Sequence, residues 1–260
     1  MSLGSTVARL GKSETARPLR RLLRPILSHW SRPIAAKLRT GHTCYVDLRS
    51  VVGQGLLVTG RMDPKLGDWI SDAVAGRDGI FIDAGANVGY FSLLALSKMR
   101  NGTAHAFEID PRTLRCLHLT QSRGNVTNLV IHECGLGAAT ATAGLVSEEE
   151  LVWTHVDFSA TRGPRFTIQP LDSFAPEFAG QAVVAMKIDI EGMELAAVQG
   201  AREILAKHRP LVVSEAIDVN MARYGSSVRE YKEFMATLGY AHRELQGTDD
   251  NTLVFTPEAI

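Results

Sequence analysis

The chain has 260 residues, of which 45% are hydrophobic and 22% are charged, a composition typical of a globular enzyme. Its charges cancel overall, but residues 1–40 hold nine Lys or Arg against Glu14, so the remainder is mildly acidic, which argues against a nucleic-acid partner. The longest apolar runs fall short of the ~20 residues of a membrane span, and no signal-peptide core is visible, so we expect a soluble protein. Cys44, Cys116 and Cys134 are odd in number and lack metal-ligand spacing, which suggests reduced thiols in a cytoplasmic protein.

Residues 1–40 are predicted to form a basic N-terminal arm. Apolar side chains recur there at helical spacing, but Pro18, Pro25 and Pro33 would break or kink a long helix. The pattern fits a segment that contacts a membrane surface or a partner, and an Arg-rich transit peptide is a third alternative. We prefer an arm that packs on the domain.

Residues 41–78 are predicted to form a small cap over the ligand site. Two short strands, Thr43 to Leu48 and Gly55 to Thr59, are expected on either side of a turn at Gly53. Asp63 precedes a proline, so it is expected to cap the N-terminus of a helix that follows.

From residue 79 to the C-terminus, apolar strands alternate with helices, which predicts an α/β domain with helices on both faces of a Rossmann-like sheet. The predicted strands are 80–84, 103–109, 128–134, 183–190 and 211–216, and the predicted helices are 89–100, 111–123, 194–207 and 228–238. A short polar loop joins the last two strands, 240–245 and 251–255. It can only connect antiparallel strands, so the sheet is expected to be mostly parallel with a C-terminal antiparallel strand.

The chain is organised around a glycine turn that follows the first of these strands. Asp83, Gly85 and Gly89 are spaced D-x-G-x-x-x-G, and an apolar helix follows. Gly85 permits a sharp turn and Gly89 a close approach to a strand or ligand, while free N–H groups at the helix start favour polar or anionic groups. The spacing differs from the G-x-G-x-x-G of dinucleotide sites, which weakens a pyrophosphate-binding interpretation.

Glu108 ends the next predicted strand, 23 residues after Gly85. A carboxylate at that distance, on the neighbouring strand, can accept hydrogen bonds from both hydroxyls of a ribose. A helix cap or a salt bridge is the alternative. For Asp110, which precedes a proline, the helix cap is the better interpretation.

Several carboxylates are predicted at the C-terminal ends of the strands, where open α/β sheets bind ligands. They are Asp83, Glu108, Glu133, Asp189, Glu191 and Glu215. The period of two places Lys187, Asp189 and Glu191 on one face of their strand, an unusual row unless the groups pair or act chemically. An internal ion pair from Lys187 to a neighbouring carboxylate is the structural alternative.

Three blocks of this sequence resemble the FkbM-type methyltransferases: DAGANVGY from Asp83, AFEIDP from Ala106, and KIDIEGMEL from Lys187. The resemblance covers about Asp63 to Phe255. It implies the class I methyltransferase fold, S-adenosyl-L-methionine as the cofactor, and methyl transfer, usually to a hydroxyl of a sugar or secondary metabolite. The cofactor-binding residues that it implies are Asp83, Gly85, Ala86, Asn87, Gly89, Tyr90, Phe91, Glu108, Cys134 and Asp189.

Methyl transfer to an alcohol requires removal of the acceptor proton, and Asp189, Glu191 and Glu215 are the candidate catalytic residues. They could instead hold Mg²⁺ or Ca²⁺, and the sequence leaves this open. His155 is a further base candidate. The expected acceptor is a small molecule or a glycan, and the region from Ser147 to Gly163 matches no known pattern. The competing functions are a nicotinamide-dependent oxidoreductase, disfavoured by the turn spacing and the terminal hairpin, and a non-catalytic binding module.

Overall fold

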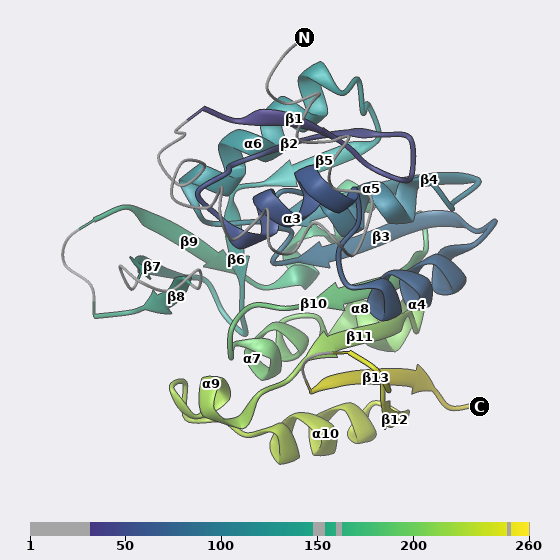
Figure 1. Ribbon diagram of the computed structural model, residues 1–260. Helices are drawn as coiled ribbons and strands as arrows, with labels where there is room; N and C mark the ends of the chain where they lie inside the picture. The colour runs from purple at the N-terminus through teal and green to yellow at the C-terminus, as the bar shows by residue number, and fades with distance from the viewer. Residues whose placement is uncertain (1–31, 148–153, 160–162, 249–250, 260) are drawn as a thin grey trace, which may run out of the picture.

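The computed structural model describes residues 32–147, 154–159, 163–248 and 251–259. At its centre is a seven-stranded sheet (Figure 1). In spatial order its strands are β12 (Tyr240–Glu244), β13 (Thr252–Pro257), β11 (Leu211–Glu215), β10 (Val183–Ile188), β3 (Asp78–Ala84), β4 (Asn101–Phe107) and β5 (Leu129–His132). Strands β11, β10, β3, β4 and β5 are parallel, whereas β13 is antiparallel to both β11 and β12. The predicted mostly parallel sheet with a C-terminal antiparallel strand is confirmed.

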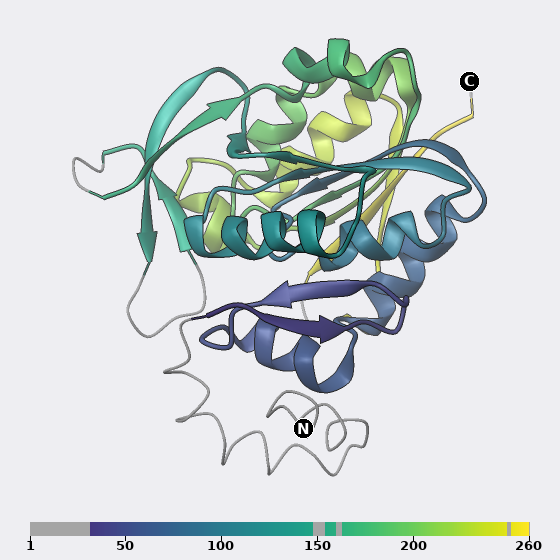
Figure 2. The same ribbon diagram turned by 90° about the horizontal axis from the view of Figure 1, so that it is seen from above.

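Helices cover both faces of this sheet (Figure 2). One face packs against α4 (Pro64–Val74), α5 (Tyr90–Leu96) and α6 (Pro111–Arg123), and the other against η2 (Leu171–Phe178), α7 (Glu194–Gln199), α8 (Arg202–His208) and α10 (Val228–Thr237). Strand alternation divides the core in two, since Phe81 joins the first apolar cluster and Ile80 and Ile82 join the second. A short helix, α9 (Asp218–Ala222), follows β11.

The predicted helix 194–207 is interrupted, and α7 and α8 meet at Gly200. A Cβ atom there would lie 2.0 Å from the carbonyl oxygen of Gly137, so only glycine permits this approach of two backbones. The predicted helix caps are present. The Asp110 carboxylate accepts a 2.8 Å hydrogen bond from the backbone N–H of Arg112, and the Ser227 hydroxyl accepts one from that of Glu230.

The N-terminal layer consists of β1 (Ile34–Lys37), β2 (Thr43–Val46) and α3 (Val51–Thr59), and the β1–β2 hairpin lies beneath α6 (Figure 2). The expected strand at Gly55 to Thr59 was wrong, because these residues belong to α3. Ser50 caps this helix by accepting a hydrogen bond from the N–H of Gly53, and Gly60 ends it in the left-handed region. Strand β1 lies within the segment assigned to the basic arm, of which residues 1–31 lie outside the described residues.

A second, four-stranded sheet projects from the domain and was not predicted (Figure 1). Its strands, in spatial order, are β6 (Cys134–Leu136), β9 (Arg165–Gln169), β7 (Ala141–Ser147) and β8 (Thr154–Asp157). The predicted strand 128–134 is therefore divided, because β5 ends at His132 and Cys134 begins β6 in the second sheet.

All three cysteines are buried and free, as expected. Within the described ranges, every helix is too short or too polar to cross a lipid bilayer.

Candidate active site

A cavity of about 480 Å³ lies at the C-terminal ends of β3, β4, β10 and β11. This volume is in the usual range for small-molecule sites. Val52 of α3 lines it from the N-terminal layer, Leu66 of α4 lines it from the main domain, and Val156 and Ile168 line it from the small sheet. The three parts of the fold thus meet around one cavity, at the edge of the sheet where the rule for open α/β sheets predicts a ligand.

The glycine turn forms one wall of this cavity. Gly85 has φ +75, and a Cβ atom at this position would lie 1.8 Å from the carbonyl oxygen of Asp189. The N–H groups of Gly85 and Ala86 both donate to the carbonyl oxygen of Phe107, each at 3.0 Å. The turn is therefore fastened between β4 and the segment after β10. Gly89 serves a different contact, since its missing Cβ makes room for Leu117 of α6.

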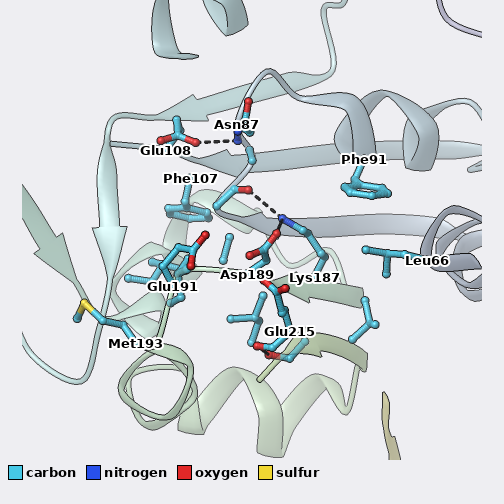
Figure 3. A pocket seen from close by; sticks show the side chains of 18 of the residues that line it. Leu66, Asn87, Phe91, Phe107, Glu108, Lys187, Asp189, Glu191, Met193 and Glu215 are labelled. Atoms are coloured by element: carbon cyan, nitrogen blue, oxygen red, sulfur yellow. Dashed lines mark hydrogen bonds and ion pairs between the residues drawn. The ribbon is translucent and has the colours of Figure 1, made fainter. Parts of the chain in front are cut away.

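Glu108 lies beside this turn at the end of β4 (Figure 3). One carboxylate oxygen accepts a 2.7 Å hydrogen bond from the N–H of Asn87, and the other accepts bonds from the N–H groups of Ile109 and Asp110. Burial raises the pKa of Glu108, although these three hydrogen bonds oppose the shift. A carboxylate offers about four acceptor positions, so this one can accept a further hydroxyl.

Lys187 is buried and connects three groups. Its Nζ atom donates to the carbonyl oxygen of Gly85 at 2.8 Å and lies 3.2 Å from Asp189 and 3.5 Å from Asp83. Burial by itself would lower the pKa of Lys187, but the two carboxylates raise it. The internal ion pair that the sequence left as an alternative for Lys187 is present. Asp83 also accepts a 2.7 Å hydrogen bond from Ser92 and is fully buried outside the cavity lining, so its contact with the cofactor stays a prediction.

Asp189 lies between Lys187 and Glu215. Burial would raise its pKa, but the charge of Lys187 and hydrogen bonds with Glu215 and Lys187 hold the pKa below its ordinary value. A hydrogen bond between two carboxyl groups requires a proton on one of them. Asp189 and Glu215 are linked by such a hydrogen bond at the cavity wall.

Glu191 also lines this cavity, but the strand alternation that was predicted to place it there does not extend to it. Strand β10 ends at Ile188, and Glu191 adopts a left-handed backbone conformation with φ +57, so strand alternation does not extend to it. Its carboxylate accepts a 3.1 Å hydrogen bond from the side-chain amide of Asn220. Burial, followed by the charges of Asp189 and Glu194, raises the pKa of Glu191 to about 7. A carboxyl group with this pKa is half-ionised near neutral pH.

The structure brings most of the predicted site residues together. Those that line the cavity are Gly85, Ala86, Asn87, Phe91, Glu108, Cys134, Asp189, Glu191 and Glu215. Asp83, Gly89, Tyr90 and Glu133 do not line it, and contact of the first three with the cofactor stays a prediction. Glu133 is exposed and bonds to His118 at 2.8 Å, because the chain leaves the main sheet directly after His132.

Other lining residues were missed. Val52 lies in α3, where a turn was predicted, and Leu66 lies on α4, whose sequence did not show which cavity it would face. Val156 and Ile168 come from the unpredicted small sheet. His155 belongs to β8, but its side chain lies outside what the structure describes.

Comparisons with known proteins agree with this geometry. Residues 83–241, more than half of the chain, match the family model described as "Methyltransferase FkbM domain". "Methyltransferase 1" of Beauveria bassiana is 24% identical over 145 residues, which are 47% of this chain and 58% of that protein.

Solved structures with a similar fold include methyltransferase FkbM from Methylobacillus flagellatus, at 19% identity and a TM-score of 0.47, covering 78% of this chain and 52% of that one. Precorrin-6y C5,15-methyltransferase from Geobacter metallireducens has 15% identity and a TM-score of 0.43, with 74% and 85% covered. The chain thus spans a little over half the length of the fungal relative and of the first of these structures.

Proposed function

The chain belongs to the FkbM methyltransferase family, and on that premise we propose that it transfers a methyl group from S-adenosylmethionine to a hydroxyl oxygen of an uncharged sugar or secondary metabolite. S-adenosylmethionine is the cofactor that the family implies, and it supplies an electrophilic methyl group on a positively charged sulfur. The observation that carries the proposal is Glu191, a cavity carboxyl group whose pKa is raised to about 7.

The residues around the glycine turn fit this cofactor. Glu108 retains acceptor capacity that suits a ribose hydroxyl. Ile109 and Leu136 give the cavity an apolar region next to Glu108 that suits a purine ring. The carboxylate of Asp189 lies where negative charge would favour a bound sulfonium.

The charge of the cavity favours an uncharged acceptor. Among the lining residues that the structure describes, carboxyl groups come from Asp63, Glu108, Asp189, Glu191 and Glu215, and a cationic side chain comes from Lys187. That cation is already engaged by two carboxylates and a carbonyl oxygen. A phosphate or carboxylate on the acceptor would meet repulsion without a partner, whereas sugar hydroxyls can donate to these oxygens.

The three carboxyl groups differ in the chemistry available to them. Glu191 suits the general base, because a base is most effective when its pKa lies near the working pH. Asp189 is a weaker base, since Lys187 stabilises its ionised form. Glu215 is hydrogen-bonded to Asp189 and can orient the acceptor by hydrogen bonding.

Calorimetry with S-adenosylmethionine and with NAD tests the cofactor, and we expect binding of the first alone. Mass spectrometry then tests the acceptor on matched pairs, each a neutral sugar or secondary metabolite and its phosphate ester. We expect methylation of the neutral member. Binding of NAD would favour an oxidoreductase. Binding of S-adenosylmethionine without a methylated product from any of the pairs would favour a binding module. Preferential methylation of the phosphate esters would overturn the proposed acceptor class.

A further inference from the structure

Two histidines face each other on the sheet surface that η2 covers, outside the candidate active site. His105 belongs to β4 and His132 to the neighbouring β5 (Figure 1). Both side chains are buried, with 3% and 9% of their surface exposed, and the Nδ1 atom of His105 lies 2.9 Å from the Nε2 atom of His132. Two imidazole nitrogens therefore converge on one point.

Glu177 of η2 supplies a third potential ligand. One carboxylate oxygen of Glu177 and one nitrogen from each imidazole all lie within 4.8 Å of one another. The Glu177 side chain is exposed, so an ion can enter from solvent, and a water molecule can complete its coordination.

Aromatic rings hold the two imidazoles in place. The His132 ring stacks on Phe107 with centroids 4.4 Å apart and meets Phe174 edge-on, and His105 meets Phe178 edge-on at 5.0 Å.

We propose that His105, His132 and Glu177 form a binding site for one Zn²⁺ ion. Two imidazole nitrogens, one carboxylate and a water molecule are a common tetrahedral ligand set for zinc. Two nitrogens on such an ion lie about 3.3 Å apart, given Zn–N bonds of ~2.0–2.1 Å, so the observed pair needs to separate by only a few tenths of an ångström. Binding places the ring protons on His105 Nε2 and His132 Nδ1, so no net proton is released.

The competing explanation is a neutral hydrogen bond between the two rings, which accounts for the 2.9 Å distance without an ion. It assigns no role to Glu177, and this difference makes the two explanations testable. The site is separate from the carboxylates of the active site, because Phe107 lines the cavity whereas the three proposed ligands do not. We infer that the ion fastens η2 to the edge of the sheet rather than taking part in methyl transfer.

The experiment uses the full-length protein after treatment with a chelator. Zn²⁺ is titrated in competition with a chromogenic chelator, and Co²⁺ is titrated while its visible absorption is recorded. We expect one ion per chain, an absorption spectrum typical of tetrahedral Co²⁺, and a higher Tm with Zn²⁺. His132→Gln should weaken Zn²⁺ binding by ~100-fold or more, and Glu177→Gln by ~10-fold or more.

His118→Gln is the matched control, because His118 lies on α6, on the opposite face of the sheet from η2, and forms an exposed pair with Glu133 at 2.8 Å. It should bind Zn²⁺ as the unmodified protein does. Glu177→Gln guards against a folding defect, since Glu177 is exposed. Absence of stoichiometric binding, or equal binding by His132→Gln, would overturn the site. Equal binding by Glu177→Gln in a folded protein would overturn the proposed ligand set.

Discussion

The Nζ atom of Lys187 donates a 2.8 Å hydrogen bond to the carbonyl oxygen of Gly85, which connects the middle of β10 to the glycine turn after β3. The same ammonium group forms ion pairs with Asp83 and Asp189, so one buried cation stabilises both the turn and two carboxylates. Stability and cofactor binding are therefore linked through this side chain.

Replacement of this cation tests that link. Lys187→Met leaves Asp83 and Asp189 without their counter-charge, and removal of one partner from a buried pair typically costs ~3–5 kcal/mol. We expect a loss of that size in the free energy of unfolding, measured by urea denaturation at pH 7. Lys207→Met on the exposed surface of α8 is the control and should change the free energy by less than about 0.5 kcal/mol. Equal stability of the two variants would show that the ion pairs contribute little.

Gly85→Ala should abolish measurable binding of S-adenosylmethionine. The added Cβ would lie 1.8 Å from the carbonyl oxygen of Asp189, and the φ of +75 is unfavourable for any residue with a side chain, so the turn must move. Calorimetry measures the binding, and circular dichroism checks the fold. Gly55→Ala is the control, because the space around Gly55 in α3 is open. Normal binding by Gly85→Ala would mean that the turn tolerates a shift of backbone.

The sequence predicted the main sheet well because its signals are local. Apolar strands, the capping residues Asp110 and Ser227, and the short loop before β13 each fix an element without knowledge of its neighbours. The same reasoning failed for α3. Gly53 and Gly55 suggested a broken strand pair, but Gly53 is needed because a side chain there would meet the carbonyl oxygen of Asp47 at 2.0 Å. The contact lies within the turn that starts α3, where Ser50 caps the helix, and the two glycines obscured that capping signal.

The candidate site shows a different limit. Glu108, Asp189 and Glu215 follow from their positions at strand ends, which a parallel sheet brings together. Asp83 occupies an equivalent position, yet it pairs with Lys187 beneath the cavity floor. Which carboxylate faces the ligand depends on side-chain packing between strands. Spacing along the chain does not determine it.

Glu108→Ala should weaken binding of S-adenosylmethionine by ~10–100-fold. The substitution removes a charge-assisted hydrogen bond to the ribose, worth ~1.5–3 kcal/mol, and also frees the N–H of Asn87 that positions the turn. Glu133→Gln, which alters an exposed carboxylate outside the cavity, should bind normally in the same titration. A folded Glu108→Ala protein with unchanged affinity would contradict the ribose assignment.

Mg²⁺ and Ca²⁺ should not activate the enzyme. Asp189 is already occupied by Lys187 and Glu215, and the buried ammonium would repel a divalent cation at this position. The methylation rate should therefore stay constant as either chloride salt is added, with NaCl at equal ionic strength as the control for screening. Saturable activation by one ion would assign these carboxylates to a metal site instead.

Glu191→Gln should lower turnover by ~10²–10⁴-fold while leaving the affinity for S-adenosylmethionine nearly unchanged, because it removes only the base. In the unmodified protein the base must be ionised, so the rate should fall about tenfold per pH unit below the pKa of about 7 and level off above it. The variant should lose this pH step, a change that a purely structural role would not produce. Rates are measured by product formation from pH 5 to 9, cofactor affinity by calorimetry, and Glu133→Gln should keep the profile of the unmodified protein. If Glu191→Gln retained the step, the titrating base would be another group, and Glu215→Gln would be the next variant to measure.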